Sequence, residues 1–182
     1  MQMEVFIKRI AVMGGIVLSV VFAAMVFAGN GTAARGSNNC SRVGTWHGVG
    51  DSGTSWIATD TPGPNATVGQ LAMEWVKMDP TRGNLYPTVI RVTNALGVWE
   101  KVNQRKYEYT WIAYGLNASG VPVYVARESG IASMANCDHV DLTYVLQLFG
   151  PTQDISTERP DLGCFPGTAV KTRMSLVQAI CE

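Results

Sequence analysis

The sequence predicts an all-β fold, a small antiparallel up-and-down β-barrel of about eight strands that follows an N-terminal signal peptide. Short runs rich in Val, Ile, Tyr, Trp and Thr are bounded by Gly, Pro, Asn and Asp, as is typical of strands and turns. Helical periodicity is nearly absent after residue 34. The first of these runs, "VGTWHG" at 43–48, opens with a glycine, a small polar residue and a tryptophan.

The N-terminus has the layout of a secretory signal peptide. Lys8 and Arg9 form a basic region, an uncharged stretch spans 10–28, and small residues with possible cleavage after Ala28 or Ala34 follow. The alternative is an uncleaved membrane anchor, because the uncharged stretch approaches the length that spans a bilayer. We therefore expect residues 1–34 to be removed and residues 35–182 to form a single exported domain, secreted or periplasmic.

Composition narrows the classes of partner. The chain has 14 Lys and Arg against 14 Asp and Glu, so it offers no general electrostatic attraction to nucleic acid or to an anionic membrane. With five Trp, six Tyr and five Phe, it has enough bulky side chains for a hydrophobic core.

The strands are expected in a regular series separated by turn-rich loops. One segment, "LAMEWVKM" at 71–78, is compatible with either a strand or a short helix. Two stretches rich in turn residues, 60–69 and 150–168, are predicted loops. The expected strands are 43–49, 55–59, 70–78, 87–93, 96–102, 106–116, 121–130, 139–149 and 170–178.

The clearest local prediction is a hairpin across "NASG" at 117–120. If Leu116 opposes Val121, one face of the hairpin carries most of its aromatic rings, and Arg127 lies diagonal to Glu108 as an ion pair. The aromatic face could line a ligand cavity, or it could be core or an interface. Its candidate ligand-binding residues are Tyr107, Tyr109, Trp111, Tyr124 and Glu128.

An even number of cysteines in an exported chain predicts two disulfides. Closing a barrel pairs its first and last strands, which brings Cys40 beside Cys181 and leaves Cys137 and Cys164 to hold the long loop. Their spacing is unlike that of a zinc site, so we expect no metal. The cluster Asp138, His139 and Asp141 has no evident third ligand, and we interpret it as the polar start of a strand.

The same closure brings Trp46 near Arg173, whose planar guanidinium can stack on an indole ring. A Gly-x-Trp on the first strand (Gly44, Trp46) with an arginine on the last resembles lipocalins and the wider calycin group. The segment "GVWEKVNQRKYEYTWIAYGLNASGVPVYVARESG" at 97–130 is similar to uncharacterised bacterial lipocalin-like proteins. The resemblance implies a barrel closed at one end by these three residues, with a cavity for a small ligand. It supplies no catalytic residue.

We find no motif for a serine nucleophile, a phosphate-binding loop or a zinc helix. The leading hypothesis is therefore an exported barrel that binds a small apolar or aromatic ligand without a cofactor. One alternative is a structural protein that oligomerises through the aromatic strand face. Another is a cyclase or isomerase that acts by confinement and places Glu128 or Arg127 in its cavity.

Overall fold

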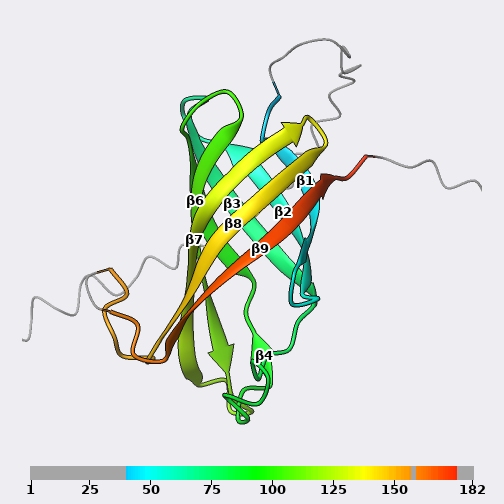
Figure 1. Ribbon diagram of the computed structural model, residues 1–182. Coiled ribbons are helices and arrows are strands. Elements are labelled where there is room, and N and C mark those ends of the chain that lie inside the picture. The colour runs from blue at the N-terminus through cyan, green and yellow to red at the C-terminus, as the bar shows by residue number, and fades with distance from the viewer. Residues whose placement is uncertain (1–39, 157–158, 176–182) are drawn as a thin grey trace, which may run out of the picture. The chain divides into compact units, whose positions relative to one another are not determined.

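The computed structural model describes residues 40–156 and 159–175, which form nine strands (Figure 1). The predicted signal peptide and Cys181 lie outside these residues. Across the described ranges, no helix is long and apolar enough to span a membrane.

Eight of the strands close into an antiparallel barrel, which confirms the predicted fold class. Each strand pairs with the next along the barrel, and the pairing of β1 with β9 closes the ring. The short β4 pairs with the end of β6 and lies outside the ring. The strands are β1 (Gly44–Gly50), β2 (Ser55–Pro62), β3 (Val68–Lys77), β4 (Arg91–Val92), β5 (Ala95–Lys101), β6 (Lys106–Leu116), β7 (Pro122–Asn136), β8 (His139–Phe149) and β9 (Gly163–Arg173).

The segment that sequence left undecided is strand β3. Leu71 and Met73 are buried while Ala72 and Glu74 are exposed, the period of two that a strand with one face on the core must show. Several predicted boundaries are wrong. The strand predicted at 87–93 is only β4, and the loop predicted at 60–69 is shorter, because β2 continues to Pro62 and β3 begins at Val68. The strand predicted at 170–178 ends at Arg173. β7 continues to Asn136, and β9 begins at Gly163 within the stretch predicted to be a loop.

Aromatic rings fill the barrel because glycines face them across neighbouring strands. A Cβ added at Gly48 or Gly115 would lie 2.2 or 2.3 Å from a ring atom of the facing aromatic residue. The missing side chain lets each ring lie against the backbone of the next strand, which curves the sheet and fills the interior. The glycines over which a facing ring lies, with their partners, are Gly48 and Trp56, Gly69 and Trp99, Gly115 and Tyr124, and Gly167 and Tyr144.

The predicted hairpin forms with a different register. Leu116 pairs with Pro122 after a bulge, and Trp111 pairs with Glu128. The shift is an even number of residues, so the predicted aromatic face stays together, and it points into the barrel. The expected pair of Arg127 with Glu108 is wrong, because Arg127 opposes Ile112 and donates to the Gln147 side chain instead.

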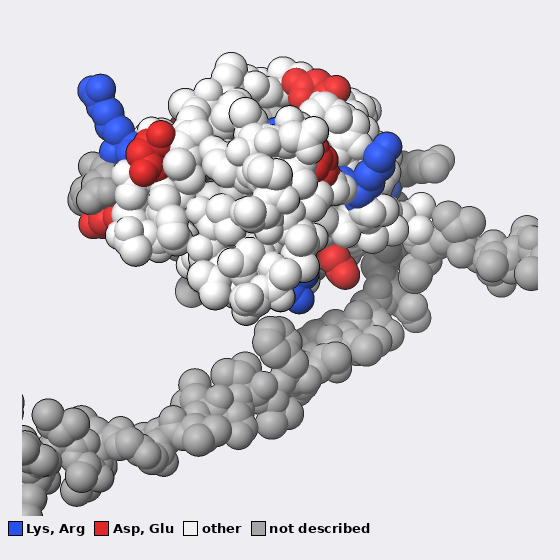
Figure 2. Space-filling model, turned by 90° about the horizontal axis from the view of Figure 1, so that it is seen from below, with Lys and Arg blue, Asp and Glu red and all other residues white. Residues whose placement is uncertain are grey.

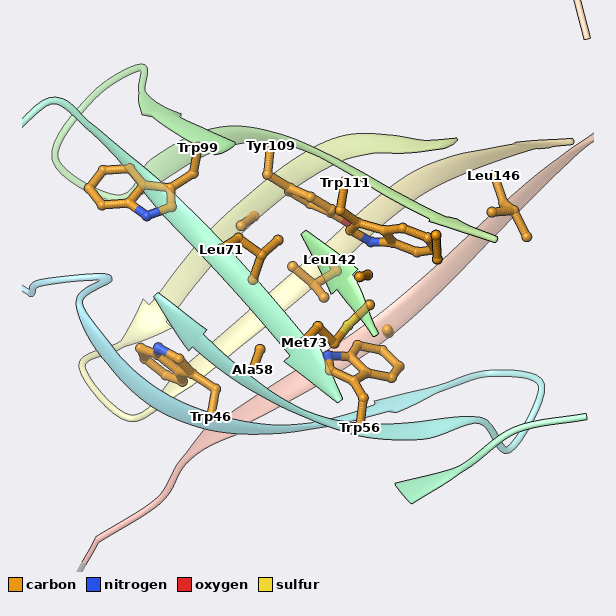
Figure 3. Close-up of a cluster of buried hydrophobic side chains, with 14 of the residues drawn as sticks. Trp46, Trp56, Ala58, Leu71, Met73, Trp99, Tyr109, Trp111, Leu142 and Leu146 are labelled. Carbon is orange, nitrogen blue, oxygen red and sulfur yellow. The ribbon is translucent and has the colours of Figure 1, made fainter. Parts of the chain in front are cut away.

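The two ends of the barrel differ. The closed end is the end where β1 begins and β9 finishes, and the open end holds the 51–54 turn, residues 77–94 and the loop before β9 (Figure 1). In the interior, Trp46 and Trp99 lie toward the closed end and Trp56 and Trp111 toward the open end (Figure 3). Small and aliphatic side chains such as Leu71 separate the two groups.

Candidate functional site

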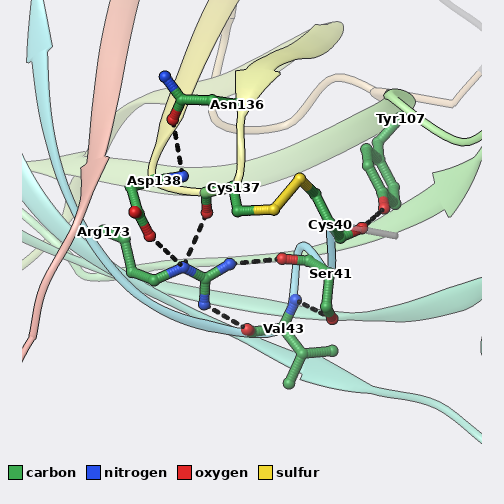
Figure 4. The surroundings of a disulfide bond; sticks show 8 residues. All are labelled: Cys40, Ser41, Val43, Tyr107, Asn136, Cys137, Asp138 and Arg173. Atoms are coloured by element: carbon green, nitrogen blue, oxygen red, sulfur yellow. Dashed lines mark hydrogen bonds and ion pairs between the residues drawn. A yellow bond between two sulfur atoms is a disulfide. The ribbon is translucent and has the colours of Figure 1, made fainter. Parts of the chain in front are cut away.

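Arg173 joins the first and last strands at the closed end. It lies directly opposite Trp46, and its Cζ is 4.2 Å from the centre of the indole ring. Its guanidinium donates hydrogen bonds to the backbone oxygens of Val43, Ser41 and Cys137 (Figure 4). Gly44 has a φ of 142°, and a Cβ there would lie 2.6 Å from Arg173 Nη1. Gly44, Trp46 and Arg173 therefore form one packed unit that requires a glycine.

The disulfide also lies at the closed end, but it does not follow the predicted pairing. Cys40 bonds to Cys137 with a Cα–Cα distance of 4.8 Å (Figure 4). Cys164 has a free, exposed thiol. Its place on β9 is opposite Gln147, near the other end of β8. Cys137 lies in the turn before β8, and the strand from His139 to Gln147 spans ~26 Å, far beyond the reach of a disulfide. The chain before β1 crosses the end of the barrel instead of running on beside β9, so Cys40 meets Cys137.

Three charged side chains are buried beneath this end, and sequence reasoning missed them. Asp60 Oδ2 accepts hydrogen bonds from Arg42 Nε at 3.0 Å and from Lys171 Nζ at 3.1 Å. All three residues are at most 4% exposed. Burial is the main cause that lowers the pKa of Lys171, to about 8, while Asp60 opposes that shift. Asp60 stood in a predicted loop, so nothing in its local sequence marked it as buried.

Aromatic rings surround the same cluster. The Arg42 guanidinium lies 5.9 Å from the Trp99 ring centre, 5.8 Å from that of Tyr107 and 5.3 Å from that of Tyr109. Trp99 and Tyr107 also meet edge to face, with centres 5.6 Å apart. Tyr107, a predicted cavity residue, thus belongs to the packing of the closed end.

At the open end, a hollow of about 490 Å³ lies between the 51–54 turn, residues 77–85 and the neighbouring ends of β8 and β9. A smaller pocket of about 40 Å³ lies inside the barrel, and both are lined by Arg82, Tyr144 and Leu146. In the view onto this end, uncharged side chains cover most of the surface and charged ones are scattered (Figure 2). The larger volume lies in the range of small-molecule sites, whereas the smaller one has room for little more than a water.

Tryptophans form one wall of the inner pocket. Trp56 and Trp75 meet with ring centres 6.4 Å apart, and Trp75 and Trp111 with centres 5.5 Å apart. Trp75 Nε1 donates to the backbone oxygen of Thr93 at 2.9 Å, which fixes the orientation of the middle ring. The wall is therefore apolar and rigid.

Glu128 provides a carboxyl group at this wall. Its Oε1 accepts hydrogen bonds from Tyr109 Oη at 2.9 Å and from Trp111 Nε1 at 3.0 Å. Burial raises the pKa of Glu128 to about 7, and the two hydrogen bonds and the positive charge of Arg82 partly oppose this shift. Both bonds end on Oε1, so they orient the carboxyl group through that oxygen and leave Oε2 out of these contacts.

The structure brings together only some of the predicted cavity residues. Trp111 and Glu128 line the inner pocket, and the Tyr109 hydroxyl donates a hydrogen bond to Glu128. Tyr124 instead packs on Tyr86 with ring centres 5.1 Å apart, and its hydroxyl donates to the backbone of Pro80. The sequence analysis missed other lining residues, whose only signal was that several are aromatic and face glycines. They are Trp56, Met73, Trp75, Arg82, Tyr144 and Leu146.

The acidic and histidine cluster at the start of β8 is a surface feature. His139 Nε2 lies 3.3 Å from Asp141 Oδ1, and Asp138 pairs with Arg173. In the part of the chain that the structure describes, no group of three or more His, Cys, Asp and Glu side chains is placed to hold a metal ion.

Comparison of the sequence with protein-family models and with curated proteins finds no match. The fold and the site alone therefore define the class of protein: an up-and-down barrel packed at one end and hollowed at the other.

Proposed function

We propose that the protein is an exported, lipocalin-like barrel that binds a small apolar or aromatic ligand in the open-end hollow. The observation that carries the proposal is the continuity of a 490 Å³ hollow with a tryptophan-lined pocket that contains one positioned carboxyl group. An apolar wall with few oriented polar groups is the usual composition of a small-molecule site. Because the inner pocket is small, the body of the ligand occupies the outer hollow and only its tip reaches Trp111.

The disulfide supports the exported location. Cys40–Cys137 closes a loop across most of the barrel, and such bonds persist in oxidising compartments. The packed unit of Gly44, Trp46 and Arg173 supports the proposed likeness to lipocalins, because it is the arrangement on which that resemblance rests.

The aromatic strand face does not support the alternative of an assembly protein. Tyr107, Tyr109 and Trp111 are 2–5% exposed in the single chain, inside the barrel. Any interface between copies must use other residues.

A second candidate, an isomerase or cyclase, is favoured by Glu128. A carboxyl group with a pKa of about 7 in an apolar pocket is poised to move a proton near neutral pH. If the protein is such an enzyme, a ligand recovered from the wild type will differ in chromatographic retention from the ligand recovered from Glu128→Gln. If it is a binding protein, the two recovered ligands will be identical.

Native mass spectrometry of protein exported by a bacterial host and never denatured tests the proposal. We expect extra mass that is lost on denaturation. The same spectrum gives the mature N-terminus, the number of disulfides and the subunit count. A clean apo oligomer, together with no binding of any apolar probe in titrations, would contradict ligand binding.

Two variants locate the site. Trp111→Ala removes part of the inner wall, and Leu146→Trp fills the space between the inner pocket and the hollow. Both are expected to weaken binding of a naphthyl probe by about tenfold or more. Ile112→Ala is the matched control, because Ile112 is the next residue of β6 and faces outward. Equal binding by all variants would place the ligand elsewhere.

A further inference from the structure

Arg82 is presented to the hollow by a turn that its own hydrogen bonds hold in place. Asp79 accepts bonds from the Thr81 backbone nitrogen at 2.9 Å, the Thr81 hydroxyl at 2.7 Å and the Gly83 backbone nitrogen at 2.7 Å. Arg82 itself has a φ of 53°, a left-handed conformation that non-glycine residues rarely adopt. The turn therefore fixes the direction in which the Arg82 side chain leaves the backbone.

The guanidinium of Arg82 carries unused hydrogen-bonding capacity. Its Nε is buried and has no hydrogen-bond partner, and Arg82 forms no ion pair with any carboxylate of the described residues. The side chain interacts with the Tyr124 hydroxyl and lines both the hollow and the inner pocket. A buried donor without an acceptor is costly, so a ligand that supplies the acceptor gains binding free energy.

The carboxylates around the hollow are already engaged. Asp51 accepts from the backbone nitrogen and the hydroxyl of Thr168 at 3.0 and 3.3 Å, and Asp79 accepts from its own turn. Lys77 also lines the hollow and is exposed. Glu128 of the inner pocket interacts with the charge of Arg82 but forms no ion pair with it, and Arg82 also faces the hollow, where the lining carboxylates are engaged elsewhere.

We propose that Arg82 binds the carboxylate of a small aromatic acid whose ring lies in the open-end hollow. This inference rests on the proposed ligand-binding function and assigns its ligand class. The planar guanidinium matches the two oxygens of a carboxylate, and Lys77, the other cation that lines the hollow, is exposed to solvent. A doubly charged group such as a phosphate would bring excess negative charge close to Glu128 and Asp79.

Matched pairs of ligands test the assignment without knowledge of the natural ligand. Benzoate is compared with benzamide and 2-naphthoate with 2-naphthamide, pairs that share the ring and differ in charge. Binding is followed by calorimetry at pH 7.5 and by quenching of tryptophan fluorescence. We expect each acid to bind about tenfold or more tightly than its amide, the usual advantage of a charge-assisted hydrogen bond over a neutral one.

Arg82→Gln is expected to abolish the preference for the acid and to leave binding of the amide within about twofold. Arg91→Gln is the matched control, because Arg91 is an exposed arginine on β4 that does not line the hollow. Circular dichroism and the thermal transition establish that each variant is folded.

The outcomes separate the two proposals. If acid and amide bind the wild type equally, carboxylate recognition is wrong but ligand binding stands. If neither binds, both proposals fall. If Arg82→Gln keeps the full preference for the acid, the anchor is not Arg82 and the inference is overturned.

Discussion

At the closed end of the barrel, Arg173 stacks on Trp46 and Arg42 forms an ion pair with Asp60, whereas at the open end Arg82 forms no ion pair with a carboxylate of the described residues. Both ends use the same residue types, namely tryptophans, arginines and a buried carboxyl group. At the closed end Asp60 forms ion pairs with both Arg42 and Lys171, although Arg42 Nη1 and Asp60 Oδ1 have no hydrogen-bond partner, and the disulfide fastens the chain there. Aromatic residues next to a cation therefore mark a candidate binding site only where the cation has no carboxylate paired with it.

The largest expected difference between the ends concerns their carboxylates. Asp60→Asn leaves the charges of Arg42 and Lys171 buried without an anion, so we expect the free energy of unfolding to fall by about 3–5 kcal/mol. Asp51→Asn, in the exposed turn at the open end, is the control and is expected to cost less than about 1 kcal/mol. Urea unfolding measures both. Similar losses would show that the closed end is not held by its buried charges.

The cysteines give the next largest difference. Cys137→Ser opens a loop of 97 residues and is expected to cost about 2–5 kcal/mol. Cys164→Ser at the open end removes an exposed free thiol and is expected to change stability by less than about 0.5 kcal/mol. Denaturant unfolding under oxidising conditions is the measurement. A large loss from Cys164→Ser would be evidence that this thiol has a structural partner.

Glycines sharpen the comparison further. Gly44 and Gly53 both have a φ in the left-handed region, but only Gly44 has a neighbour where a Cβ would sit, Arg173 Nη1. Gly44→Ala therefore combines backbone strain with displacement of Arg173, and we expect it to cost about 2–3 kcal/mol. Gly53→Ala adds strain alone, about 1 kcal/mol. Thermal unfolding of the two variants compares the costs. Equal costs would mean that Arg173 moves away freely.

The smallest effect is a pH dependence at the open end. The pKa of Glu128 is about 7 in the folded protein, against an ordinary value of 4.5. The folded state thus holds a proton that the unfolded state releases, so this group stabilises the fold at low pH and loses that contribution as pH rises from about 4.5 to 7. Glu128→Gln removes the dependence. Because the group is half-buried, we expect the stability difference between wild type and variant to change by only about 1–2 kcal/mol across that range. Parallel stability curves would show that Glu128 titrates normally.

Sequence alone was sufficient for the barrel and for most of its strands. Alternating residues and turn formers are local signals, and the hairpin around 117–120 was found despite its shifted register. β9 was missed at its start because "GCFPG" has a proline and two glycines, which are poor strand formers. It is a strand because β8 offers a continuous partner from His139 to Leu148, a constraint set by closure of the barrel and not by local composition.

The candidate site was less accessible to sequence reasoning. Trp111 and Glu128 could be found because they lie on one hairpin. Arg82 and Trp56 reach the same pocket from separate segments, and only the three-dimensional closure of the barrel brings them together. The predicted disulfide pairing was wrong for the same reason. The path of the chain before β1 follows the buried pair of Arg42 and Asp60, which local sequence does not indicate.

The glycines that face aromatic rings across the barrel have a consequence for how the sequence can drift. A side chain gained at Gly48 or Gly115 is tolerated only if Trp56 or Tyr124 becomes smaller at the same time. Each glycine and its facing aromatic residue should therefore covary during evolution, and such covariation identifies spatial neighbours. Distant relatives of this chain should be easier to detect from linked exchanges of glycine and aromatic residues than from overall sequence identity.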